Sequence, residues 1–431
     1  MKTAMRQSMW RIMAIATICW MAVILAPGLV PAEDLQVDEI YGNNPYHFYG
    51  GYLSTDNVTV GVEGEGTLIH RLGLHNVGQT LILGEQAGSY GQYLMPALSL
   101  GVLWSQDEII GYGGRGDFVQ KLGLHWVKGN LALAYEPNSI GNYFLHDGKF
   151  SVEGHEHIGR LGTGTFNQKG GTHEVSRLVL GNPEGGTGTY NYEGGQLKTE
   201  AIEVKGNGTF NVTGVEEKFI TTVYGNVTIE DGGTVKTTNA EVIWDGAVVV
   251  QPGGVFKSDP STNQFEEDFI CRGTIIGSEG DTLRFSQDVY LEEAEVDLAE
   301  ARIEFIPSEE AEAATEHCLR LPAERLTVDT FSIAEGEKVR LETDGVIYAR
   351  DLEGLVIDEE GIIRNIIVCE EVTDVRLIYD IDENEELGGR AFILEGSDEP
   401  CVVPTPLPAS VLLLGSGLVG LGLLGRRGRR S

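Results

Sequence analysis

The sequence predicts an all-β protein whose middle forms a parallel β-solenoid, and three observations carry this prediction. Glycine is abundant, with 58 of 431 residues, and it separates short runs rich in Val, Thr and Tyr. Glycine-containing landmarks recur in the same order at offsets of 50 and then 48 residues. Gly-Gly pairs stand where a coiled chain would turn its corners, because glycine tolerates the tight and left-handed backbone conformations needed there.

Three landmarks define the repeat, which is expected to span residues 58–256. Each copy opens on a glycine cluster, passes a His-x-Val step and an apolar run, and then reaches a Gly-x-Tyr step. The clusters begin at Gly61, Gly111 and Gly159, the histidines are His75, His125 and His173, and the tyrosines are Tyr93, Tyr143 and Tyr190. A period of about 48 residues predicts two stacked rungs of about 24 residues each, which share one core.

The flanks of the repeat region are expected to close the solenoid. Residues 33–57 would form an N-terminal cap, and residues 257–400 an acidic, β-rich continuation that ends in a C-terminal cap. A cap is expected because an open solenoid end would leave strand edges unpaired. An Ala- and Glu-rich stretch at 308–317 is a candidate helix.

Residues 1–32 are typical of a secretory signal peptide. Basic residues precede an apolar stretch, and small side chains precede Ala32, which predicts cleavage between Ala32 and Glu33 after export by the Sec machinery. The remaining cysteines would then reach an oxidising compartment, where they could form two disulfides in any of three pairings. They are Cys271, Cys318, Cys369 and Cys401.

The segment 402–431 combines a proline motif, a short apolar run and an arginine tail. The motif residues are Val403, Pro404, Pro406, Leu407 and Pro408, and the tail residues are Arg426, Arg427, Arg429 and Arg430. The apolar run approaches the length of a transmembrane helix, and the arginines would hold its far end in the cytoplasm.

In this order the three elements resemble the PEP-CTERM sorting signal, although Thr405 stands where the usual motif has Glu. The resemblance implies a transient tether in the inner membrane, cleavage near the proline motif by an exosortase, and transfer to the cell surface or the medium. The unit at 162–173 resembles repeats common in such surface proteins and in autotransporter-like proteins. That resemblance, with the usual hand of parallel crossovers, implies a right-handed solenoid.

The charge balance excludes one class of partner. Asp and Glu number 65 against 31 Lys and Arg, for a formal net charge of −34. Such a chain repels phosphate backbones, so no nucleic acid is expected, whereas solubility outside the cell fits. One weak metal candidate is a calcium loop, because Asp380, Asp382 and Asn384 place oxygens at alternate positions. Glu385 occupies the place of the usual turn glycine, and no other cofactor is expected.

Histidines and aromatic residues are the remaining binding candidates. The repeat histidines would stack, but equivalent residues of two-rung units lie about 9–10 Å apart, too far for one ion to bridge. His155 and His157 form another weak metal pair. Aromatic rings can stack on sugars, although most are expected in the core. The candidates are Tyr90, Tyr93, Tyr112, Trp126, Tyr135, Tyr143, Phe144, Tyr190 and Tyr192.

Together these features predict a non-enzymatic, exported bacterial protein of the cell surface or extracellular matrix. Its role would be structural or adhesive, in association with extracellular polysaccharide. The sequence contains no nucleophile elbow and no phosphate loop, so no catalytic residue is assigned. The alternative is a secreted lyase or glycosidase on a β-helix, which should show a flank cleft where acids and a basic group converge.

Overall fold

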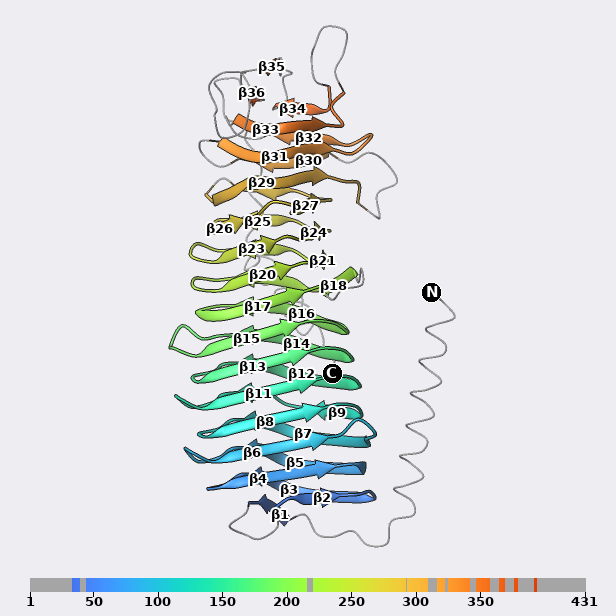
Figure 1. Ribbon diagram of the computed structural model, residues 1–431, viewed down its shortest axis with the longest axis vertical. Coiled ribbons are helices and arrows are strands. Elements are labelled where there is room, and N and C mark those ends of the chain that lie inside the picture. Colours follow the sequence, from blue (N-terminus) through green and yellow to red (C-terminus); the bar gives the residue numbers. More distant parts are fainter. Residues whose placement is uncertain are drawn as a thin grey trace, which may run out of the picture. The chain divides into compact units, whose positions relative to one another are not determined.

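The computed structural model describes residues 33–38, 44–214, 220–291, 293–308, 316–321, 325–341, 346–356 and 364–368, and the short strands 376–378 and 391–393. Every regular element in these ranges is a strand, and the strands stack into a parallel solenoid (Figure 1). The predicted all-β solenoid is therefore confirmed. No helix among the described residues is long and apolar enough to cross a bilayer. The tail segment 402–431 lies outside them.

The first half of the stack contains eighteen strands in chain order. They are β1 (Glu33–Val37), β2 (Tyr46–Phe48), β3 (Tyr52–Val60), β4 (Glu65–His70), β5 (Leu72–Leu83), β6 (Tyr90–Met95), β7 (Leu100–Ile110), β8 (Arg115–Gln120), β9 (Leu124–Val127), β10 (Leu131–Leu133), β11 (Ile140–Leu145), β12 (Lys149–Ile158), β13 (Thr163–Gln168), β14 (Thr172–Leu180), β15 (Thr187–Tyr192), β16 (Gln196–Val204), β17 (Asn207–Thr213) and β18 (Ile220–Tyr224).

The second half continues the stack with shorter strands. They are β19 (Asn226–Ile229), β20 (Thr234–Thr238), β21 (Glu241–Asp245), β22 (Val248–Val250), β23 (Val255–Asp259), β24 (Thr262–Phe265), β25 (Phe269–Cys271), β26 (Thr274–Ile276), β27 (Thr282–Phe285), β28 (Val289–Tyr290), β29 (Glu295–Phe305), β30 (Glu316–Arg320), β31 (Arg325–Ile333), β32 (Lys338–Leu341), β33 (Val346–Glu353), β34 (Ile366–Val368), β35 (Arg376–Ile378) and β36 (Ala391–Ile393).

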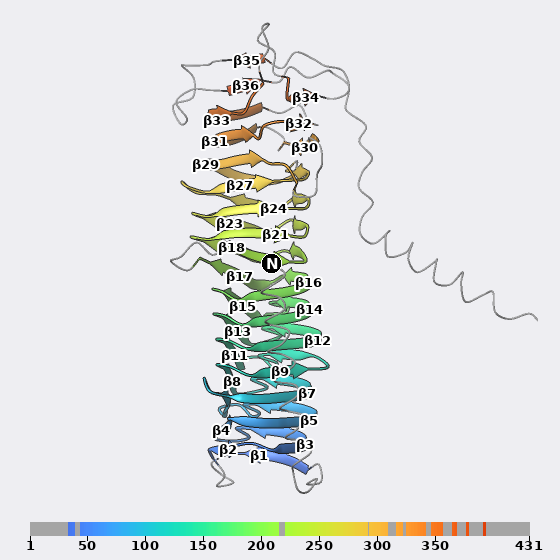
Figure 2. The same cartoon turned by 90° about the vertical axis from the view of Figure 1, so that its right-hand side faces the viewer.

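Each rung of the repeat region contributes to two sheets. One, the straight sheet, is built from β2, β4, β6, β8, β11, β13, β15 and β17. The other, the bent sheet, runs through β3, β5, β7, β9, β10, β12, β14, β16 and β18. Its long strands shift register where they bend, between Val152 and His155 in β12 for example. Figure 2 shows successive rungs lying one above another.

Strand register confirms that the 48-residue repeat is two rungs. Gly66 pairs with Gly91, and the same column continues through glycines of the next five rungs of the straight sheet. They are Gly116, Gly141, Gly164, Gly188 and Gly208. A Cβ atom on Gly141 would lie 2.1 Å from the carbonyl oxygen of Ile110, so a side chain there would collide with the neighbouring rung.

The core is a set of columns that run through the stack. Alternate residues point inward, as the pleat of a strand requires. In the straight sheet the inward rings of Tyr93, Phe118, Tyr143, Phe166 and Tyr190 are all fully buried. Neighbouring rings stack with centroids 4.7–4.9 Å apart and planes within 3–5° of parallel. The rung spacing of a parallel sheet is thus also a stacking distance for aromatic rings.

The flanks differ in detail from the expected caps. Parallel pairing already begins at β1, which pairs with β3, and it crosses residue 257 through β23. Near the other end β36 pairs antiparallel with β33 and β35. The helix expected at 308–317 is wrong at Glu316 and His317, which begin strand β30, because the stack buries the inward His317. Residues 309–315 lie outside the described ranges.

Candidate functional site

The repeat histidines lie in the core, where glutamates accompany two of them. His125 Nδ1 lies 2.8 Å from the hydroxyl of Tyr143, and its Nε2 lies 2.7 Å from Glu108 Oε1. His173 Nδ1 lies 2.9 Å from the hydroxyl of Tyr190. Its Nε2 is 2.8 Å from Glu156 Oε2, although the two are not aligned for a hydrogen bond. The same pairing recurs at His317 and Glu337, at 3.1 Å.

Glutamine side chains establish the direction of the hydrogen bonds around His125. Gln120 Nε2 donates to the carbonyl oxygens of Gly123 and Lys149, so Gln120 Oε1 accepts from the Tyr143 hydroxyl at 2.6 Å. That hydroxyl then accepts from His125 Nδ1, while Nε2 faces a carboxylate. His125 and Glu108 therefore form a hydrogen-bonded pair in which both side chains are fully buried.

His70 and His75 lack this arrangement. Both Nδ1 atoms lie near the hydroxyl of Tyr93, at 2.9 and 3.0 Å, and the two rings are 6.2 Å apart. Burial is the largest cause that lowers the pKa of His70 to about 4 and that of His75 to about 3. Both are therefore neutral near pH 7. The repeat histidines are thus buried polar groups of the core. Among the described residues, no group of three potential metal ligands occurs.

Several predicted site residues cannot be placed. Ala32, the calcium candidates Asp380, Asp382 and Asn384, and the sorting residues Val403, Pro404, Pro406, Leu407, Pro408, Arg426, Arg427, Arg429 and Arg430 lie outside the described residues, as do Cys369 and Cys401. Glu33 begins β1. Cys271 is a free buried thiol whose pKa is raised to about 12 by burial, and Cys318 is also buried. The disulfide pairing stays a prediction.

Burial divides the aromatic candidates into two groups. Tyr93, Tyr143, Tyr190 and Tyr192 fill the core, as expected for most of these residues, so they are not available to stack on a sugar. Tyr90, Tyr112, Tyr135 and Phe144 are half-buried. Tyr112 and Tyr135 stack at 5.2 Å on a corner of the coil, where Arg160 lies 4.0 Å from the Tyr135 ring centre. His157 is held by the carbonyl oxygen of Gly181, and burial lowers its pKa, while His155 is exposed.

Trp126 stands out because it is 43% exposed and has an exposed neighbour. Trp104, on the next rung, is its register partner and is 37% exposed. Trp104 is not among the residues singled out from the sequence, although Gly101-Val102-Leu103-Trp104 and Gly123-Leu124-His125-Trp126 share a pattern. That pattern predicts two indoles side by side on the outer face of the bent sheet.

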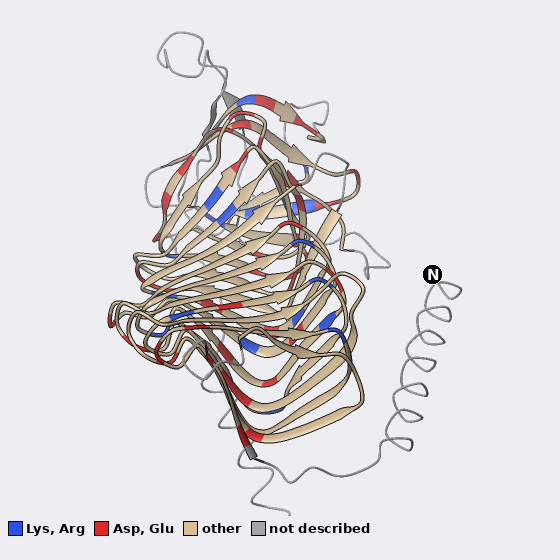
Figure 3. Cartoon of the chain, turned by 60° about the horizontal axis from the view of Figure 1, so that its bottom comes forward, with Lys and Arg blue, Asp and Glu red and all other residues tan. Residues whose placement is uncertain are grey.

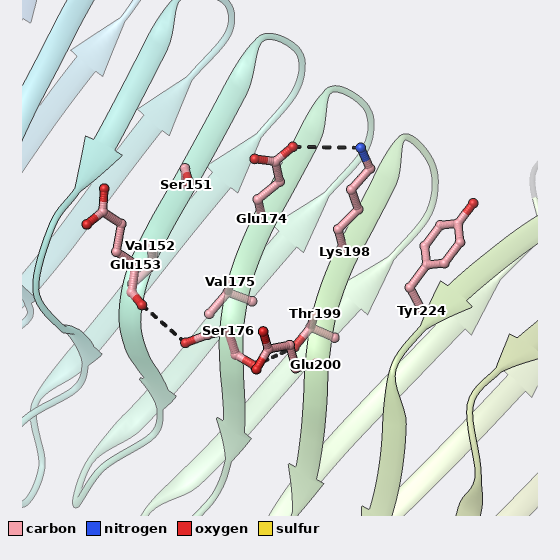
Figure 4. Close-up of a pocket in the computed structure, with 10 residues that line it drawn as sticks. All are labelled: Ser151, Val152, Glu153, Glu174, Val175, Ser176, Lys198, Thr199, Glu200 and Tyr224. Atoms are coloured by element: carbon pink, nitrogen blue, oxygen red, sulfur yellow. Dashed lines mark hydrogen bonds and ion pairs between the residues drawn. The ribbon is translucent and has the colours of Figure 1, made fainter. Parts of the chain in front are cut away.

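A groove follows the two indoles along the outer face of the bent sheet. On successive rungs, Trp126 pairs with Ser151, Ser151 with Glu174, and Glu174 with Lys198. On the next rung Leu197 pairs with Val223, which places Tyr224 beside Lys198. The groove has a volume of about 580 Å³ (Figure 4). It is lined by Ser151, Val152, Glu153, Glu174, Val175, Ser176, Lys198, Thr199, Glu200 and Tyr224.

Most polar groups of the groove already have a partner. Glu174 pairs with Lys149 at 2.6 Å and with Lys198 at 3.7 Å. The indole N–H of Trp126 donates to Glu153 at 2.9 Å. No carboxylate that lines the groove is buried. The groove therefore presents exposed, mutually compensated charges beside aromatic rings, a composition suited to binding polar ligands with apolar faces.

No protein-family model, no curated protein and no solved structure matches this chain. Its function is therefore inferred from its own residues.

Proposed function

We propose that the chain is an exported structural or adhesive protein of the bacterial cell surface or extracellular matrix, associated with extracellular polysaccharide. The observation that carries the proposal is the parallel pairing of the described strands from β1 to β34, with continuous buried columns inside. Each rung contacts only its neighbours, so such a stack presents an extended, regular surface and needs no active site. Figure 3 shows Asp and Glu distributed along the strands and corners of the stack, with Lys and Arg in fewer places.

The terminal segments support an external location. Residues 1–32 would direct export, and the PEP-CTERM-like tail would tether the chain in the inner membrane until an exosortase cleaves it. The net charge of −34 favours solubility and keeps copies apart after release. The acidic end of the stack would serve as its cap, where β36 adds antiparallel pairing to β33.

Deletion of residues 402–431 is expected to abolish display at the surface. The tail holds the apolar segment and arginines that would anchor the chain before transfer, so the shortened chain should accumulate in the periplasm. The measurement is labelling of intact cells with a membrane-impermeant reagent. Thr405→Glu, which restores the usual sorting motif, is the matched control and should be labelled as strongly as the native chain. Equal labelling of the shortened chain would contradict the proposed route.

A polysaccharide-active enzyme is the second candidate, favoured by the groove that gathers Glu153, Glu174, Glu200 and Lys198. A glycosidase, however, needs a carboxyl group that keeps its proton near neutral pH, which a buried or strongly apolar site provides. The groove offers only exposed or ion-paired carboxylates. When the protein is incubated with polysaccharides, we expect no new reducing ends. Release of reducing ends that is lost in the Glu174→Gln variant would instead establish an enzyme.

A further inference from the structure

We propose that the outer face of the bent sheet binds a neutral polysaccharide chain laid parallel to the solenoid axis. The binding track consists of Trp104, Trp126, Ser151, Glu174, Lys198 and Tyr224. This inference rests on the proposed external function, which it deepens by naming the site and the class of glycan.

The two indoles form the apolar end of the track. Trp104 and Trp126 sit on adjacent rungs, about 4.8 Å apart along the axis, and both are more than a third exposed. Exposed indoles on neighbouring rungs offer flat apolar faces on which pyranose rings can stack. The Trp126 N–H is held by Glu153, and Lys128 Nζ lies 5.8 Å from the Trp104 ring centre. The rings are thus oriented before a ligand arrives, which lowers the entropy lost on binding.

The length of the track suits an oligosaccharide of several rings. Four rung steps separate Trp126 from Tyr224, a distance of about 19 Å along the axis. Tyr224 is 39% exposed and ends the groove with a third aromatic ring. Between the aromatic ends, Ser151, Glu174 and Lys198 present hydroxyl, carboxylate and ammonium groups to solvent (Figure 4). Such groups exchange hydrogen bonds with sugar hydroxyls and leave the rings to supply apolar contact.

The charges favour an uncharged glycan. Glu174 pairs with both Lys149 and Lys198, and together with Glu153 and Glu200 the carboxylates around the groove outnumber these two lysines, three to two. Glu153 and Glu200, which also line the groove, would repel an anionic group. The net charge of −34 acts in the same direction over a longer range. A neutral chain of hexopyranose units meets none of this repulsion.

The test is calorimetric titration of the processed protein, purified from the producing cells, with neutral and acidic hexasaccharides. Cellohexaose and maltohexaose are the neutral probes, and hexagalacturonate is the acidic one. We expect saturable binding of at least one neutral probe and none of the acidic probe. Trp126→Ala and, separately, Tyr224→Ala should each weaken binding about 10-fold. Tyr112→Ala, which removes a half-buried ring at a corner outside the track, should leave the affinity unchanged.

Intrinsic fluorescence gives a second readout. Within residues 33–401 the tryptophans are Trp104, Trp126 and the fully buried Trp244, so a change on titration reports on the track. Failure of both neutral probes to bind, equal binding of hexagalacturonate, or wild-type affinity in Tyr224→Ala would overturn the proposal. Self-association that Trp126→Ala abolishes would also overturn it, because the face would then belong to a second copy. Surface labelling reports on the external location separately.

Discussion

Replacing His125 with leucine is expected to destabilise the solenoid by about 3–5 kcal/mol. The substitution leaves the carboxylate of Glu108 fully buried with Ser105 as its remaining donor, at 2.7 Å. Its second oxygen, Oε2, has no hydrogen-bond partner among the described residues. A buried carboxyl group that loses its hydrogen-bond partner costs far more free energy than the added leucine side chain gains in the apolar core.

The double variant Glu108→Leu/His125→Leu should recover most of this loss, to within about 1–2 kcal/mol of the native chain. The register explains why, since Glu108 lies between Leu81 and Leu131 and His125 lies between Leu103 and Phe150. Leucines there would extend columns that are already apolar. Glu108→Leu alone should be milder than His125→Leu, because the imidazole of His125 keeps its hydrogen bond to Tyr143.

Urea unfolding of the native chain, both single variants and the double variant measures the coupling between the two residues. Lys149→Ala is the matched control, since its partner Glu174 is partly exposed and the loss should stay below about 1 kcal/mol. Additive losses in the double variant would show that the side chains of Glu108 and His125 do not stabilise each other.

Acidification from about pH 7 to about pH 4 is expected to remove on the order of 5 kcal/mol from the stability of the first rungs. The folded pKa values of His70 and His75, about 4 and about 3, lie below the value of 6.5 for an unfolded histidine. At pH values between the folded and unfolded pKa values, these two histidines bind protons in the unfolded chain but not in the folded chain. Stability is therefore fully present above pH 6.5 and is lost as the pH falls towards 4.

His75→Leu should flatten part of this pH profile. The substitution continues a column, because His75 lies between Leu53 and Leu103 in the bent sheet. Relative to the native chain, the variant should gain stability steadily as the pH falls, which urea unfolding at several pH values measures. His47→Gln, on an exposed side chain of β2, is the control and should follow the native profile. A native-like profile for His75→Leu would show that His75 is not kept neutral by burial.

The stacking of rungs could be predicted from the sequence because it depends on backbone requirements. Gly66, Gly91 and Gly116 recur where one rung passes close to the next, and a side chain at these positions would collide with backbone atoms, so glycine is required. The helix expected at 308–317 had no such constraint: Ala and Glu favour helices, but pairing with β32 decides for strand at His317. Where the stack continues, pairing with an adjacent strand overrides the helix propensity of the local sequence.

The candidate site was predicted less well, for a physical reason. Tyr93 and Trp126 both occupy repeat positions. Because neighbouring residues of a strand point to opposite faces, an error of one position reverses the prediction, and Tyr93 is buried whereas Trp126 is exposed. The buried glutamates Glu108 and Glu156 could not be identified because a carboxylate usually lies at the surface. The groove is lined by residues of β12, β14, β16 and β18, and no repeated motif marks these residues in the sequence.

Mass spectrometry of the native protein, recovered from the cell surface or the medium, tests the proposed external function most directly. We expect a mature N-terminus at Glu33 and a C-terminus between residues 403 and 410, which only export followed by exosortase-type release would produce. An intact chain that ends at Ser431 in the membrane fraction would contradict it, and the solenoid would then belong to a protein anchored by its tail.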